Sequence, residues 1–91
     1  MNPNTESRRE TVRLNNGQAS PMLLCLEPIG EQVEMAPGLT YEVVTTGGDD
    51  GVLEIFLEES KVIVYGWNNS DSAVFQDGRP VTSINFEQGR T

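Results

Sequence analysis

Histidine is absent from this 91-residue sequence, and lysine and cysteine occur once each. Serine and cysteine hydrolases most often use a histidine base, and the metal sites common in all-β folds are built on imidazole ligands. Lys61, the single lysine, opens an apolar segment, which is typical of a surface or edge position. Cys25, the single cysteine, lies inside an apolar run and is typical of a small buried side chain. We therefore predict no catalytic residue, no metal site and no cofactor, and a protein that is not an enzyme.

Two pairs of adjacent carboxylates do not change this prediction. Asp49 and Asp50 lie in a glycine-rich connection, and Glu58 and Glu59 close a predicted strand. Glycosidase chemistry needs two carboxylates that face each other across a cleft, whereas adjacent strand residues point to opposite faces. The glycine-rich connection is also too short for a calcium loop of the EF-hand type, whose oxygen ligands alternate over about twelve residues.

The aromatic end of one predicted strand is the candidate binding site. Ile63, Tyr65 and Trp67 share one strand face because side chains alternate, and the opposite face is also apolar. We favour a strand covered on both sides; the alternative is an exposed patch at Tyr65 and Trp67. Beside the amides of Asn68 and Asn69, such a patch would suit a sugar ring, a peptide or a second subunit.

Strands must position these residues, because no window places apolar side chains at helical spacing without an interrupting glycine or proline. Instead, short segments rich in strand-forming residues alternate with turn signals, at a spacing of about eight to twelve residues. The sequence predicts an all-β fold, an antiparallel β-sandwich or partly open small barrel of about seven short strands. The expected strands span residues 11–14, 22–26, 31–35, 39–46, 52–58, 61–67, 73–76 and, as a last strand, 81–86.

The clearest local feature is a predicted hairpin. Leu39 to Thr46 and Val52 to Glu58 are both rich in strand-forming residues, and a connection of hairpin length with three glycines joins them. The predicted core consists of Leu24, Leu26, Val33, Met35, Tyr41, Val43, Leu53, Ile55, Leu57, Val62, Val64 and Phe75. We expect a single β domain over residues 11–86, with a disordered N-terminal tail over 1–10 and a flexible C-terminal tail over 87–91.

The formal net charge of −8 bears on partners and compartment. Nucleic acids and anionic membranes attract basic stripes, which this chain lacks, so we predict binding to neither. Small secreted domains usually carry disulfides, whereas one cysteine cannot form an internal one. The first ten residues hold no apolar stretch of signal-peptide type, and we expect a cytoplasmic protein.

Four segments of the chain resemble a group of small uncharacterised bacterial β proteins. They are Leu26-Glu27-Pro28-Ile29-Gly30-Glu31, Met35-Ala36-Pro37-Gly38, Tyr41-Glu42-Val43-Val44 and Val62-Ile63-Val64-Tyr65-Gly66-Trp67. The group carries an aromatic residue where this chain has Ile29. The resemblance implies an all-β fold and a bacterial setting, and it implies no site residue.

Two function classes follow from these observations. The first is a non-catalytic protein-interaction or oligomerisation module that forms a homodimer through a strand edge or the Tyr65-Trp67 face, or that binds another protein, because a thin β domain gains apolar burial from a partner. The alternative is a small-ligand binding domain, for carbohydrate among other ligands, that uses Tyr65, Trp67, Asn68 and Asn69.

Overall fold

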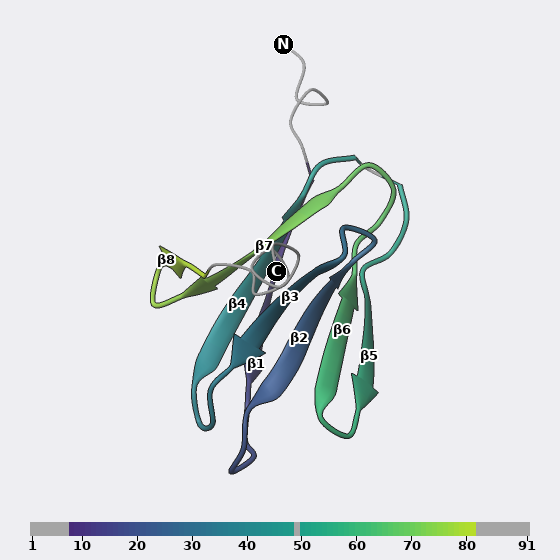
Figure 1. Ribbon diagram of the computed structural model, residues 1–91. Helices are drawn as coiled ribbons and strands as arrows, with labels where there is room; N and C mark the ends of the chain where they lie inside the picture. Colours follow the sequence, from purple (N-terminus) through teal and green to yellow (C-terminus); the bar gives the residue numbers. More distant parts are fainter. Residues whose placement is uncertain (1–7, 49, 82–91) are drawn as a thin grey trace, which may run out of the picture.

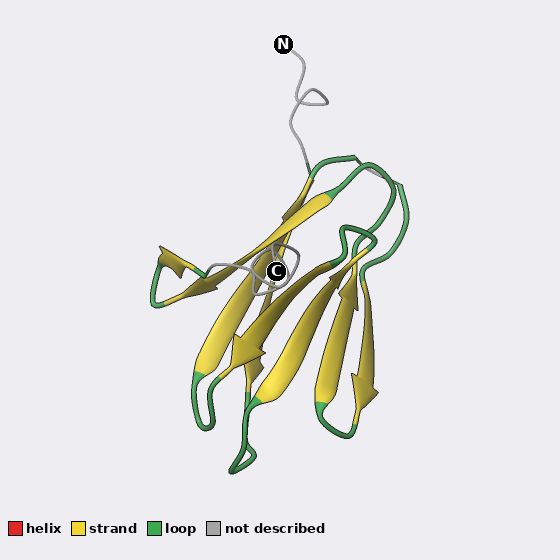
Figure 2. Ribbon diagram, viewed as in Figure 1, coloured by secondary structure: helices red, strands yellow, loops and turns green. Residues whose placement is uncertain are grey.

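The computed structural model describes residues 8–48 and 50–81, which form eight strands and no helix (Figures 1 and 2). The strands are β1 (Arg9–Asn15), β2 (Met22–Glu27), β3 (Glu31–Met35), β4 (Thr40–Thr46), β5 (Glu54–Glu58), β6 (Lys61–Tyr65), β7 (Asp71–Gln76) and β8 (Arg79–Pro80). Sheet A has the order β1-β4-β7-β8, and sheet B has the order β3-β2-β6-β5. The two sheets enclose one apolar core, so the predicted all-β fold is confirmed as a sandwich and not a closed barrel.

One strand pair departs from the predicted antiparallel arrangement. β2 and β6 run parallel, with Leu24 opposite Val62 and Leu26 opposite Val64. Parallel neighbours need a crossover connection, and here the crossover passes through β4 of sheet A before the chain returns to sheet B. All other pairs are antiparallel.

The predicted hairpin between residues 39–46 and 52–58 is wrong in its pairing. β4 lies between β1 and β7 in sheet A, whereas β5 pairs with β6 at the edge of sheet B. The glycine-rich connection therefore crosses from one sheet to the other. Glycine content and length marked a reversal of the chain, and both are equally compatible with a link between sheets.

The core lies between the sheets and is built from the inward-facing residues of both. Its buried members are Leu24, Leu26, Val33, Met35, Tyr41, Val43, Val62, Val64 and Val74, with Leu14, Met22, Leu53 and Val81 packed against them. The prediction is confirmed for most positions. It is wrong for Phe75, since Val74 occupies the inner face of β7 and a slip of one residue exchanges faces. It is also wrong for Ile55 and Leu57, which are exposed.

The N-terminal limit of the domain differs from the predicted one. β1 begins at Arg9, and Arg8 contacts residues of the fold, so the ordered domain starts before Thr11. At the other end Val81 donates its N–H to the carbonyl of Val74 at 2.9 Å. The rest of the expected last strand and the tail at 87–91 lie outside the described residues. Within the described ranges no helix is long and apolar enough to cross a membrane.

Candidate functional site

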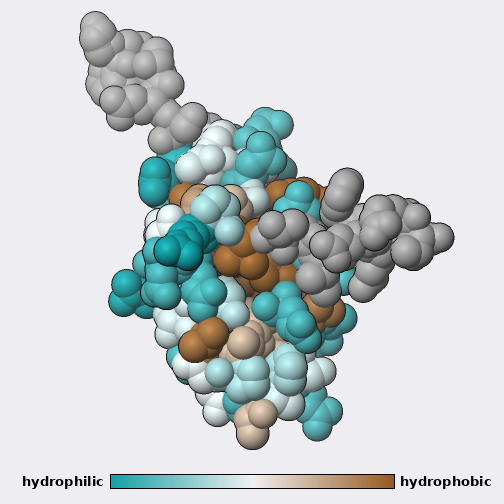
Figure 3. All heavy atoms as spheres, turned by 60° about the vertical axis from the view of Figure 1, so that its left-hand side comes forward, coloured by the Kyte–Doolittle hydropathy of each residue, from teal (hydrophilic) through white to brown (hydrophobic). Residues whose placement is uncertain are grey.

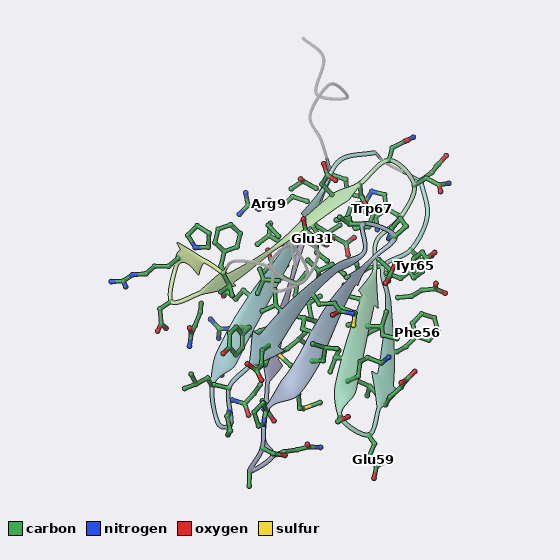
Figure 4. All side chains as sticks on the ribbon, viewed as in Figure 1. Arg9, Glu31, Phe56, Glu59, Tyr65 and Trp67 are labelled. Atoms are coloured by element: carbon green, nitrogen blue, oxygen red, sulfur yellow. The ribbon has the colours of Figure 1, made fainter. Side chains whose placement is uncertain are left out.

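The predicted aromatic patch is divided by the structure. β6 ends at Tyr65, and the N–H of Gly66 bonds to the carbonyl of Glu27 at 2.8 Å as the chain leaves the strand. Tyr65 is 42% exposed on the outer face of sheet B, whereas Trp67 is 3% exposed. Figure 4 shows Tyr65 at the β5–β6 edge and Trp67 among the loops at the end of the sandwich. The alternation rule fails at Trp67 because the strand ends two residues earlier.

Trp67 is held by contacts that we call the tryptophan cluster, formed by Arg8, Gly47, Gly48, Gly51 and Trp67. The indole Nε1–H of Trp67 donates to the carbonyl of Gly47 at 2.5 Å. The Arg8 guanidinium lies 3.9 Å from the centroid of the ring and also donates to the carbonyl of Gly51 at 2.8 Å. A cation over an indole face stabilises by about 0.5–2 kcal/mol. Trp67 therefore fixes the link between the sheets instead of presenting its ring to a ligand.

Asn68 and Asn69 occupy the exposed turn that follows Trp67. Asn69 has a φ of 62°, and the N–H of Ser70 bonds back to the carbonyl of Trp67 at 3.2 Å. Both amides are exposed, but the indole beside them is not. The four predicted binding residues thus do not share one surface that carries both aromatic rings.

Two shallow recesses lie near the β7–β8 turn, and neither includes a predicted binding residue. One is lined by Gln76, Asp77, Arg79, Pro80 and Val81, and the other by Arg13, Thr40, Glu42, Asp77 and Gly78. In the described chain, no three cysteine or carboxylate side chains come together in a metal-binding arrangement. Asp49 lies outside the described residues.

Cys25 is buried on the outer face of sheet B, in agreement with its predicted place as a small covered side chain. Burial raises the pKa of its thiol above the ordinary value, Lys61 opposes this shift, and the negative charges of Glu27 and Glu58 add to it. A thiol with a raised pKa is protonated at neutral pH and is a poor nucleophile.

The surface that the sequence did not reveal is the edge strand β5. Val52 is 71% exposed just before the strand, and within it Ile55 is 40%, Phe56 48% and Leu57 76% exposed. We call these four residues the β5 edge. In the sequence they form an almost continuous apolar run, which we interpreted as a core strand. Strand order alone shows that this run lies at the end of a sheet.

Side chains of the β5 edge project to both faces of sheet B. Ile55 lies opposite Val64, so it points to the core side, and Phe56 lies opposite Ile63, so it points outward. In Figure 1 no strand of sheet A lies behind β5, which explains the exposure of Ile55 and Leu57. On the outer face, Phe56, Ile63 and Cys25 form one cross-strand row.

Charged residues border this apolar surface. Glu54 and Glu58 lie at the two ends of β5 on the same face as Phe56, and Glu59 follows in the turn. Lys61 Nζ lies 3.8 Å from a carboxylate oxygen of Glu58. Figure 3 shows the side of the molecule away from β5, where hydrophilic residues surround a central apolar area. Within β5, Ile55, Phe56 and Leu57 thus form a narrow apolar strip between two glutamates.

Comparisons with known proteins leave the function to be argued from this geometry. No protein family, no curated protein and no solved structure matches the chain.

Proposed function

We propose that this protein is a non-catalytic interaction module that forms a homodimer through β5. The observation that carries the proposal is an edge strand with apolar, exposed side chains on both faces and, among the described residues, no strand paired to its outer side. Such an edge presents a row of backbone donors and acceptors that can pair with another strand. Edges that remain unpaired are often short or carry charges, proline or a bulge. β5 is a short strand with a glutamate at each end, but its three central residues, Ile55, Phe56 and Leu57, carry no charge and include no proline.

A second copy suits this edge because it would cover apolar side chains that sheet A leaves exposed. Ile55 and Leu57 point to the core side of sheet B but lie beyond the cover of sheet A. Strand addition would place another apolar strand beside them and extend the sheet. The single cysteine and the acidic composition favour a soluble, cytoplasmic setting. A bacterial origin rests on the sequence resemblance alone.

The small-ligand alternative has less support. It required Tyr65 and Trp67 on one exposed face, and Trp67 is buried in the tryptophan cluster. Tyr65 remains exposed on the outer face of sheet B, where it lies opposite Glu54 and diagonal to Phe56.

Sedimentation equilibrium at about 10–100 μM tests the proposal with two matched variants. Leu57→Lys places a charge in the proposed interface and should shift the chain toward the 10.0 kDa monomer. Ala73→Lys makes the same change in charge at an exposed position of β7 and should leave the dimer intact. A wild-type chain that sediments as a monomer throughout, or equal effects of the two variants, would contradict the proposal.

A further inference from the structure

We propose that the two copies pair antiparallel through β5 in one register, with Phe56 on the two-fold axis; this inference rests on the proposed function. β5 reads Glu54-Ile55-Phe56-Leu57-Glu58, which has the same order of residue classes in both directions. A two-fold interface brings the same surface of both copies together, so it requires self-complementarity. β5 is self-complementary when the two-fold axis passes through Phe56.

The register follows from comparing the possible centres. About Phe56, Ile55 of one copy faces Leu57 of the other on the core side, and the two Phe56 side chains meet on the outer face. About Ile55, each Phe56 would face a Glu54. About Leu57, each Phe56 would face a Glu58. Only the first arrangement pairs every apolar residue of β5 with another apolar residue, and it brings Ile55 and Leu57 of both copies together on the core side.

Repulsion between like charges opposes this register, and the salt dependence of dimerisation measures this repulsion. Each Glu54 faces a Glu58 of the other copy, and like charges directly opposite each other are destabilising. Lys61, at 3.8 Å from Glu58, partly offsets this repulsion. Each chain also carries a formal charge of −8. Because salt screens repulsion between exposed charges, dimerisation should strengthen as salt rises.

The buried area indicates a weak complex. An aromatic side chain has roughly 150–250 Å² to bury, so Phe56, at 48% exposure, contributes about 100 Å². With similar contributions from its neighbours, β5 supplies on the order of 400 Å² per copy, below the roughly 800 Å² of a standard interface. We therefore expect dissociation in the micromolar range, with backbone hydrogen bonds adding to the apolar contacts.

Disulfide trapping in a Cys25→Ala background tests the register without removing the apolar residues. Residues directly opposite in an antiparallel pair have Cβ atoms about 4.5–5.5 Å apart, close enough for a disulfide after a small adjustment. An equal mixture of Glu54→Cys and Glu58→Cys chains should give a mixed cross-linked dimer on mild oxidation. Each variant alone should cross-link at least tenfold less, since like positions then lie about four residues apart along the pair.

Each outcome separates the register from the proposed function. A dimeric Cys25→Ala parent in which Ile55→Cys or Leu57→Cys links to itself more readily than the mixture links would overturn the register and leave the dimer standing. A parent that stays monomeric at 50 mM and 500 mM salt would overturn both proposals.

The salt dependence tests the nature of the partner. Tighter dimerisation at 500 mM than at 50 mM salt supports a second acidic copy. If the chain instead stays monomeric and binds a synthetic peptide of alternating lysine and valine, with affinity that falls as salt rises, the occupant of the edge is a basic strand from another protein and the dimer is wrong.

Discussion

Asn16 shows at the scale of a single residue how a loop position can carry the stability of the fold. Its side chain is fully buried, and its Nδ2 group donates to the carbonyls of Ser20 at 2.9 Å and Met35 at 3.0 Å. Its Oδ1 accepts the N–H of Gln18 at 2.9 Å. Its own N–H bonds to the carbonyl of Leu39 at 3.0 Å. The side chain of Asn16 therefore links the end of β1 in sheet A to the end of β3 in sheet B.

Replacing Asn16 by Ala should therefore destabilise the protein by about 2–4 kcal/mol, because the buried carbonyl of Met35 loses its partner and the part-buried bonds to Ser20 and Gln18 are lost as well. The matched control is Asn15→Ala, at an exposed side chain that donates to Thr40 Oγ1 at 2.9 Å. This control should cost less than about 1 kcal/mol. Urea unfolding followed by the fluorescence of Trp67 measures both. Equal losses in the two variants would show that burial of Asn16 adds nothing.

At the scale of elements, the connection between β4 and β5 decides how the sheets are joined. Gly47, Gly48 and Gly51 all have positive φ values, and a Cβ atom added to Gly48 would collide with the carbonyl of Asn68. The chain passes so close to the turn after Trp67 that side chains are excluded. Glycine is needed here for close packing of two loops as well as for backbone conformation.

Gly48→Ala should cost about 2–4 kcal/mol, which combines the positive-φ penalty with the cost of separating two packed segments. Gly30→Ala provides the control, since Gly30 has a φ of +88° and nothing within 4 Å of the added Cβ atom. It should cost only the conformational part, about 1 kcal/mol. Equilibrium unfolding of both variants gives the difference. If Gly30→Ala were as damaging as Gly48→Ala, close packing at the tryptophan cluster would not be the cause.

At the scale of the whole molecule, the core is thin and sheet A covers only part of the inner face of sheet B. Sheet A does not extend behind β5, so part of the inner face of sheet B is open. A domain of this size buries only about 60–65% of the surface of its unfolded chain, which leaves a small margin of stability. If the protein dimerises through β5, its free energy of unfolding depends on the protein concentration.

Thermal unfolding should then depend on protein concentration. A ligand or partner that binds only the folded state stabilises it by mass action, and for a dimer of this size a tenfold rise in concentration should raise the midpoint by roughly 3 °C. Differential scanning calorimetry from about 10 to 500 μM measures this shift. Leu57→Lys should abolish the dependence, whereas Ala73→Lys should retain it. A constant midpoint for the wild-type chain would contradict dimerisation in this range.

Residue patterns within short segments specify the local elements of the fold. The residue types within short segments predicted β3 at residues 31–35 and β4 within residues 39–46. Between these strands, the N–H of Leu39 bonds to the carbonyl of Ala36 at 3.3 Å. The inward residues of β2, β3, β4 and β6 were also predicted correctly. These features depend on neighbours two to four residues apart, so a linear pattern records them.

The tertiary structure alone decided which strands pair and which surfaces remain uncovered. No local pattern distinguishes a hairpin from a crossover, so the separation of β4 from β5 and the parallel pairing of β2 with β6 were not predicted. The same reason accounts for the positions of Trp67 and Leu57. Trp67 is buried by Arg8 and a glycine-rich connection distant in sequence, and Leu57 is exposed because the opposing sheet ends before it. Burial of an apolar side chain is favourable wherever it occurs. Whether a given apolar side chain is buried depends on how segments distant in sequence pack against it.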